Sequence, residues 1–167
     1  QITIQLPGKE GSAAENLAVS LTYEVYDELP VVRKQLSITN NGPNAVAIAD
    51  LEVERINLVP VSSQQSELYT NYGSRFAWRP YHGDHHDAAI FVYNNYVKEG
   101  FILGNEAPSI LKKTEVYTDH HRISIGMTSL TDHYPFKKWI EPGEKFASPK
   151  TFICLVQSQK WEDAFEG

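Results

Sequence analysis

The stretch Leu17-Ala-Val-Ser-Leu-Thr-Tyr-Glu-Val-Tyr26 decides the fold class of this chain. Apolar or aromatic side chains fill its odd positions, and small or polar ones fill the even positions as far as Glu24. Successive side chains of a strand point to opposite faces, so this period of two is typical of a strand with one buried face. The pattern predicts a β-strand over residues 19–26.

The alternation continues on both sides of a break. Residues 27–30, Asp-Glu-Leu-Pro, interrupt it, and residues 31–39 resume it with Leu36 and Ile38 on one face. The sequence Asn40-Asn-Gly-Pro43 then predicts a turn, because Asn and Gly tolerate a positive φ and proline fixes its own. A second strand is therefore expected over residues 35–39.

A longer apolar stretch follows at residues 46–59. Its apolar side chains occupy odd positions at Leu51 and Val53 and even positions at Ile56 and Leu58. Such a change of phase inside one strand predicts a β-bulge near Glu54-Arg55. The strands expected from here on are residues 51–58, 90–93, 101–103, 114–118, 123–127 and 151–157 (with 152–156 as its apolar part), with a Pro142-Gly143 turn before the last.

These elements predict an all-β fold. Many strands joined by turns, without alternating helices, are typical of an antiparallel β-sandwich. Helical spacing is confined to residues 159–166, where Trp161 and Phe165 lie four apart and could begin a short C-terminal helix. There is no internal repeat or low-complexity linker, so residues 1–167 are interpreted as a single domain.

Composition excludes several classes of function. The chain has 167 residues, 41% of them hydrophobic and 22% charged, with a formal net charge of −6 and no basic cluster for nucleic acid. No apolar segment approaches the roughly 20 residues that span a bilayer. Cys154 has no second cysteine to pair with and is expected to be a small core residue. A secreted or periplasmic location is favoured over a cytoplasmic one.

The residues 69–87 form the least strand-like part of the sequence and are the candidate site. Long loops that combine aromatic and charged residues often carry function, because rings can stack on a sugar while polar groups bind its hydroxyls. In the alternative interpretation, the aromatic rings pack the loop onto the sandwich and the arginines pair with aspartates. The candidate carbohydrate-binding residues are Trp78, Arg79, Tyr81, His82, Asp84 and His85.

No metal, cofactor or catalytic residue is predicted. His85 and His86 are adjacent, so on a strand they would point to opposite faces and could not easily share a metal ion. Carboxylates are plentiful, but glycoside hydrolysis needs two of them in a defined geometry that the sequence does not reveal. Nucleophile-elbow, phosphate-loop and zinc-protease motifs are missing from the sequence.

Two regions resemble the N-terminal β-sandwich domain of melibiase-type α-galactosidases and related glycoside hydrolases. One is Leu21-Thr-Tyr-Glu-Val-Tyr-Asp27 with Pro30-Val-Val-Arg-Lys34 and the following Asn-Gly turn. The other is Ile140-Glu-Pro-Gly-Glu-Lys-Phe146 with Ser148-Pro149 and the apolar strand after it. Phe91-Val-Tyr-Asn94 and the segment 99–106 also fit these relatives.

The resemblance implies a supersandwich related in shape to galactose mutarotase, although 167 residues are short for a complete one. It also implies a galactoside-type carbohydrate as ligand of the parent enzyme and, as partner, a catalytic barrel of the same polypeptide. The barrel's catalytic motifs have no counterpart here, so the leading hypothesis is a non-catalytic domain that packs on the barrel and shapes the rim of its active site. The alternatives are a free-standing carbohydrate-binding module and a small sugar epimerase or lyase with a histidine acid/base.

Overall fold

The computed structural model describes residues 1–12, 14–57, 66–70, 75–77, 81–82, 88–107, 109–117 and 122–160. Within these residues the chain contains fifteen β-strands, one short 3₁₀ turn (η1, Ser109–Leu111) and no α-helix. Every strand pair is antiparallel, as in the β1–β2 and β10–β15 pairs. The predicted all-β, antiparallel fold class is therefore confirmed.

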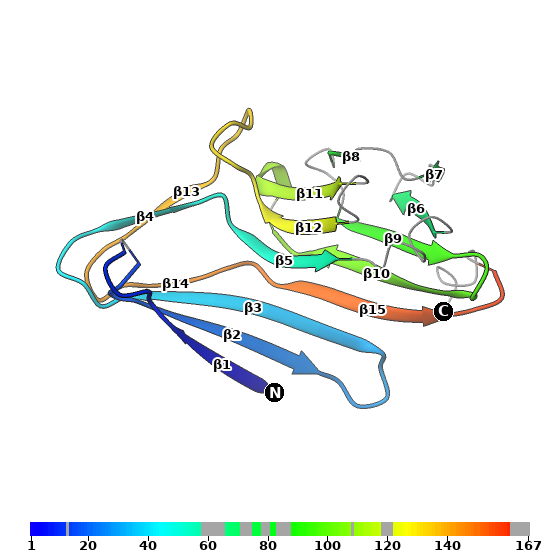
Figure 1. Ribbon diagram of the computed structural model, residues 1–167, viewed down its shortest axis with the longest axis horizontal. Helices are drawn as coiled ribbons and strands as arrows, with labels where there is room; N and C mark the ends of the chain where they lie inside the picture. The colour runs from blue at the N-terminus through cyan, green and yellow to red at the C-terminus, as the bar shows by residue number, and fades with distance from the viewer. Residues whose placement is uncertain are drawn as a thin grey trace.

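A nine-stranded sheet forms one layer of the molecule (Figure 1). Its strand order is β1-β2-β3-β15-β10-β9-β6-β7, with β14 also paired to β3. The strands are β1 (Ile2–Pro7), β2 (Leu17–Val25), β3 (Val31–Asn40), β6 (Ser66–Thr70), β7 (Arg75–Ala77), β9 (Ala89–Asn94), β10 (Glu99–Asn105), β14 (Lys145–Ala147) and β15 (Thr151–Gln157).

Two smaller sheets pack on one face of this large sheet, here called its inner face. One has the order β5-β12-β11-β8 and the other pairs β13 with β4. Their strands are β4 (Val46–Ala49), β5 (Glu52–Asn57), β8 (Tyr81–His82), β11 (Lys112–Tyr117), β12 (Arg122–Met127) and β13 (Lys137–Ile140). The opposite face of the large sheet is called the outer face.

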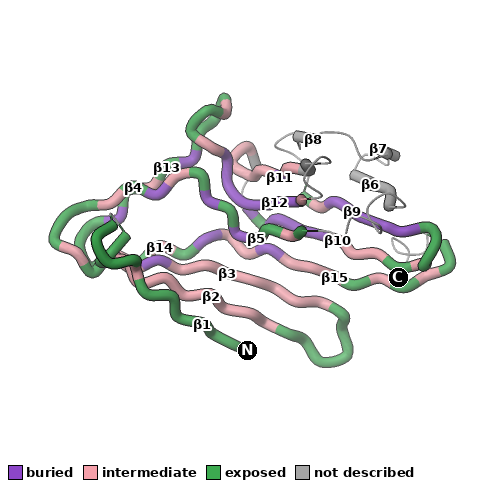
Figure 2. Tube along the Cα trace, viewed as in Figure 1, coloured by how far each residue is buried: buried purple, intermediate pink, exposed green. Residues whose placement is uncertain are grey.

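The core lies between these layers in two main clusters (Figure 2). The first cluster joins Ile38 of β3 to Val53, Met127 and Ile140 of the smaller sheets. The second cluster consists of Ile90, Val92, Leu103, Ile123 and Ile125, all 2% exposed or less. Inward-facing side chains of the central strands, such as Ile38, Leu103 and Ile123, are thus buried, as the period of two predicted, whereas all six residues of β1 are exposed.

The predicted β-bulge exists, but the long strand that was expected to contain it is divided. Asp50 has a φ of 51° and separates β4 from β5, so that the two strands enter different sheets. In the β5–β12 pair, Ile125 lies opposite Glu54 and Gly126 lies opposite Glu52, which leaves Val53 as the extra residue. The bulge is therefore one residue before the predicted position.

The turn after β3 also forms, for a different reason from the one expected. None of residues 40–43 has a positive φ. The buried side chain of Asn40 holds the turn instead: its Nδ2 donates to the carbonyl oxygens of Asn44 (2.8 Å) and Ile140 (3.0 Å), and its Oδ1 accepts from the Gly42 N–H (2.9 Å). In the Pro142-Gly143 turn, Gly143 does have a positive φ of 78°.

Two smaller expectations concern the C-terminal end of the chain. Residues 159 and 160 form a bend, and the remainder of the expected helix, residues 161–166, lies outside the described residues. Cys154 is only half-buried rather than a core residue, because it lies on the outer face of β15. Burial still raises the pKa of its thiol, which favours the protonated form at neutral pH.

Candidate functional site

The predicted loop at residues 69–87 contains short strands. Its described backbone belongs to β6 and β7 in the large sheet and to β8 in the smaller one, where Tyr81 lies opposite Val116 and His82 opposite Glu115. The segment therefore crosses from one layer to the other. Of the candidate residues, Trp78, Arg79, Asp84 and His85 lie outside the described residues, and Tyr81 and His82 are placed only by their backbone.

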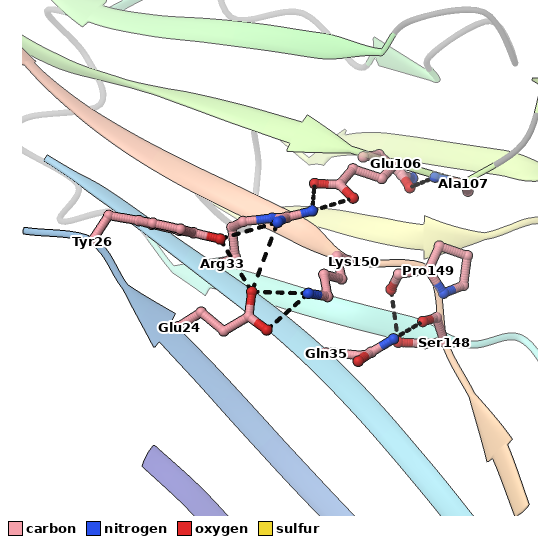
Figure 3. Close-up of polar contacts among 10 residues, drawn as sticks. Glu24, Tyr26, Arg33, Gln35, Glu106, Ala107, Ser148, Pro149 and Lys150 are labelled. Carbon is pink, nitrogen blue, oxygen red and sulfur yellow. Dashed lines mark hydrogen bonds and ion pairs between the residues drawn. The ribbon is translucent and has the colours of Figure 1, made fainter. Parts of the chain in front are cut away.

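A second polar cluster is fully described and lies on the outer face of the large sheet (Figure 3). Arg33 of β3 donates through Nη2 to both carboxylate oxygens of Glu106 at 2.6 Å and through Nη1 to the hydroxyl of Tyr26 at 3.0 Å. The Nζ of Lys150 donates to both oxygens of Glu24 at 2.8 and 2.9 Å. We call Glu24, Tyr26, Arg33, Glu106 and Lys150 the outer polar cluster.

The strand register explains why these residues meet. Glu24 and Arg33 are direct cross-strand partners in the β2–β3 hairpin, on the face opposite the core. Lys150 immediately precedes β15 and Glu106 immediately follows β10, and the Glu106 N–H donates to the Lys150 carbonyl oxygen at 2.9 Å. The cluster therefore joins four neighbouring segments of one sheet.

Ser148 fixes the approach of Lys150 to this cluster. Its N–H donates to the Leu36 carbonyl oxygen at 2.7 Å, and its hydroxyl accepts from the Leu36 N–H at 3.0 Å. Its own carbonyl oxygen accepts from Nε2 of Gln35 at 2.9 Å (Figure 3). Because Ser148 is 2% exposed, these bonds hold the segment that connects β14 to β15 in one position.

The charges of the outer polar cluster balance, and this limits its chemistry. Two carboxylates face two cations, and the hydrogen bonds from Lys150 lower the pKa of Glu24 below its ordinary value. A glycosidase needs one carboxyl that stays protonated to act as the general acid. Glu24 is ionised at neutral pH, so the cluster is suited to joining strands rather than to transferring protons.

The free energy of unfolding is expected to depend on pH through the ionisation of Glu24. Its pKa is lowered first by the Lys150 hydrogen bonds, with a further contribution from Tyr26, so the unfolded carboxyl, with its ordinary value of 4.5, binds a proton before the folded one does. The stability that Glu24 contributes is complete above that value and is lost as the pH falls through the lower folded pKa.

We therefore expect the midpoint of urea unfolding to fall less for Glu24→Gln than for the unchanged chain between about pH 6 and about pH 3.5. Glu10→Gln, at an exposed carboxylate, serves as the control and should behave like the unchanged chain. Equal falls in the Glu24→Gln variant and the unchanged chain would show that the Lys150 pair contributes nothing to stability.

Sequence reasoning did not identify the outer polar cluster. In the sequence, Glu24 and Glu106 are two of many carboxylates, and no motif distinguishes Arg33 or Lys150 as their partners. One signal was available: Glu24 and Arg33 are equidistant from the centre of the break at residues 27–30, so a simple hairpin would place them opposite each other. No comparable signal connects Glu106 or Lys150 to the hairpin.

The described residues hold no group of three or more His, Cys, Asp or Glu side chains that could bind a metal ion. The side chains of His82 and His85 are not among them, so the expected absence of a metal remains a prediction. No helix in the described part of the chain is long and apolar enough to cross a membrane.

Solved structures match this arrangement over nearly the whole chain. A GH36 α-galactosidase from Geobacillus stearothermophilus superposes with a TM-score of 0.70 at 13% identity, covering 94% of this chain and 27% of that one. A Lactobacillus brevis α-galactosidase gives 0.69 at 14% identity, covering 94% and 26%. A galactose mutarotase-like protein from Clostridium acetobutylicum gives 0.54 at 10%, covering 93% and 62%.

This chain has the galactose mutarotase-like β-sandwich fold. It spans about a quarter of the length of the α-galactosidases that it matches, and the predicted resemblance to their sandwich domain is thus confirmed at the level of fold. Neither the protein-family models nor the curated protein sequences give a match to the chain.

Proposed function

We propose that this chain is the non-catalytic N-terminal β-sandwich domain of an α-galactosidase-like glycoside hydrolase, and that it packs on a catalytic barrel of the same polypeptide. The observation that carries the proposal is the pair of coverages, 94% of this chain against 27% of the GH36 enzyme. A domain that accounts for so small a part of an enzyme leaves room in the rest of the chain for the catalytic machinery.

The chemistry of the described residues supports a non-catalytic role. The outer polar cluster engages its carboxylates in ion pairs, and Glu24 is held ionised by Lys150. Its contribution in this proposal is to keep four segments of the large sheet in register, which a domain that positions another domain requires.

The substrate class in this proposal is a galactoside. Related crystal structures of the Geobacillus enzyme contain stachyose and raffinose, so the matched fold occurs in enzymes that bind galactosides. In our chain the segment 69–87 is proposed to reach the rim of the barrel's active site, where its role would be to position the sugar. The residues proposed for that rim are Trp78, Arg79, Tyr81, His82, Asp84 and His85.

The first test is turnover by residues 1–167 alone. After purification to homogeneity we expect no hydrolysis of aryl α- or β-glycosides, because no paired-carboxylate motif is recognisable in the sequence. Turnover that is lost in Glu24→Gln or Glu106→Gln would contradict the proposal. Saturable sugar binding without turnover would favour the carbohydrate-binding module instead.

A further inference from the structure

One end of the large sheet carries large apolar side chains that the described part of the chain leaves open to solvent. The strand registers bring the β2–β3 turn, the β9–β10 turn and the last residues of β15 to this same end (Figure 1). The exposed apolar residues there are Leu29 (58%), Tyr96 (78%), Val97 (52%) and Leu155 (61%). We call these four residues the end patch.

The opposite end of β1, β2 and β3 has no such residues. Its loops cover residues 8–16, 41–45 and 141–144, and none of them contains an apolar residue larger than alanine or proline. Single exposed apolar residues are normal on a protein surface, whereas apolar residues gathered in one place mark an interaction surface. The end patch therefore distinguishes one end of the sheet as a site of contact.

A hollow of about 480 Å³ adjoins the end patch. It is lined by Pro30, Glu99, Gly100, Leu155, Val156 and Gln157. The Leu155 N–H donates to the Pro30 carbonyl oxygen at 2.8 Å, which holds the β2–β3 turn against β15. Protruding rings beside a hollow are the shape in which two protein surfaces interlock, since each side can receive anchors from the other.

The β9–β10 turn holds Tyr96 and Val97 in a fixed position. Oδ1 of Asn94 accepts from the N–H of Tyr96 at 2.9 Å and from the N–H of Val97 at 3.2 Å, and the Lys98 N–H donates to the Asn94 carbonyl oxygen at 2.9 Å. Asn94 itself is buried. Because the backbone of the turn is already ordered, a partner that contacts Tyr96 loses little free energy in ordering it.

The chain leaves the sheet next to this turn. The Ser158 N–H donates to the Lys98 carbonyl oxygen at 3.2 Å, and the Ser158 carbonyl oxygen accepts from the hydroxyl of the buried Tyr93 at 2.6 Å. Polypeptide that continues from β15 therefore starts beside the end patch. A domain tethered there would meet this surface at a high effective concentration.

We propose that the end patch is the surface on which the catalytic barrel of the same polypeptide packs, with Tyr96 as its main anchor. The inference rests on the proposed function, which places a barrel beyond residue 167. Tyrosine is enriched among the residues that contribute most to protein interfaces, and Tyr96 is the most exposed large apolar residue of the described chain.

The rim of the end patch indicates the chemistry of the facing surface. Asp27, Glu28 and Glu99 are exposed, and Lys98 is the only basic residue among residues 26–30 and 95–99. Interfaces place opposite charges against each other. The facing surface of the barrel is therefore expected to be apolar at its centre, with lysine or arginine at its rim.

The test measures the accessibility of the end patch in the full-length polypeptide. Val97→Cys leaves Tyr96 in place, and Leu130→Cys, in the loop between β12 and β13, is the control, since Leu130 is 53% exposed. Alkylation by iodoacetamide is read by mass spectrometry of the peptide that contains each position. We expect it to be at least about tenfold slower in the folded protein than in urea at position 97, and less than about threefold slower at position 130. A rate at position 97 equal to that in urea would overturn the inference.

A photo-cross-linking residue at position 97 then identifies what covers it. We expect cross-links to a peptide beyond residue 167 of the same molecule. Cross-links to a second copy, or protection that disappears on dilution, would overturn the inference in favour of self-association. Hydrolysis of an aryl α-galactoside by the same preparation separates the two proposals. An active enzyme with a reactive position 97 would contradict the inference alone, and an inactive protein with position 97 cross-linked to the following domain would contradict the proposed activity alone.

Discussion

Replacement of Gly126 by alanine is expected to lower the free energy of unfolding by about 3 kcal/mol or more. Gly126 faces the bulge of β5, and a Cβ built there would lie 2.0 Å from the carbonyl oxygen of Leu51 and 2.9 Å from Cα of Glu52. Both atoms belong to the backbone, and the same Leu51 oxygen accepts from the Met127 N–H at 2.8 Å. The clash can be relieved only by moving β5 away from β12.

Gly104→Ala is the matched control for this prediction. A Cβ there would lie 1.9 Å from the Phe152 ring, but a half-buried ring on the outer face can turn aside. We expect a cost of about 1–2 kcal/mol, and therefore a smaller decrease in the urea midpoint than for Gly126→Ala. A Gly126→Ala variant as stable as the unchanged chain would show that the backbone of β5 does not approach Gly126 this closely.

Asn40→Ala is expected to cost about 3 kcal/mol, the second large effect. The Asn40 side chain is fully buried and makes three hydrogen bonds that join the end of β3 to the turn and to β13. Alanine would leave the buried Ile140 carbonyl oxygen and the partly buried Gly42 N–H without these partners, and a buried polar group that loses its partner costs about 1–3 kcal/mol.

The neighbouring residue offers the control for Asn40. Asn41 has the same side chain in the same turn but is exposed, so Asn41→Ala should change the free energy of unfolding by less than about 0.5 kcal/mol. Urea unfolding of the two variants distinguishes the explanations. Similar losses would indicate that backbone preferences hold the turn, whereas a loss confined to position 40 would indicate that the buried side chain does.

The sequence predicted the strands well because burial of one face leaves a period of two. Residues 17–25 and 31–40 form β2 and β3, and the break between them is their connecting turn. The position of β15 between β3 and β10 could not be predicted in this way. The alternation of apolar and polar residues in a strand indicates that one face is buried, but it does not indicate which distant strand lies beside it.

The same limit applies to the polar residues. The outer polar cluster depends on contacts of Glu106 and Lys150 with hairpin residues that are 73 and 126 positions away in the sequence, and local patterns do not record such contacts. The role of Asn40 was missed for a related reason, since its partner Ile140 is 100 residues away. In contrast, the resemblance to α-galactosidases used the order of motifs along the whole chain, and the fold agrees with it.

The measurement that tests the central claim most directly is hydrolysis of an aryl α-galactoside by the full-length polypeptide, compared with residues 1–167. We predict turnover by the full-length protein, retained in its Glu24→Gln and Glu106→Gln variants, and none by residues 1–167, because the proposed function assigns the reacting carboxylates to a barrel outside this chain. A full-length protein that binds galactosides without cleaving them, or one whose turnover depends on a carboxylate within residues 1–167, would contradict this account.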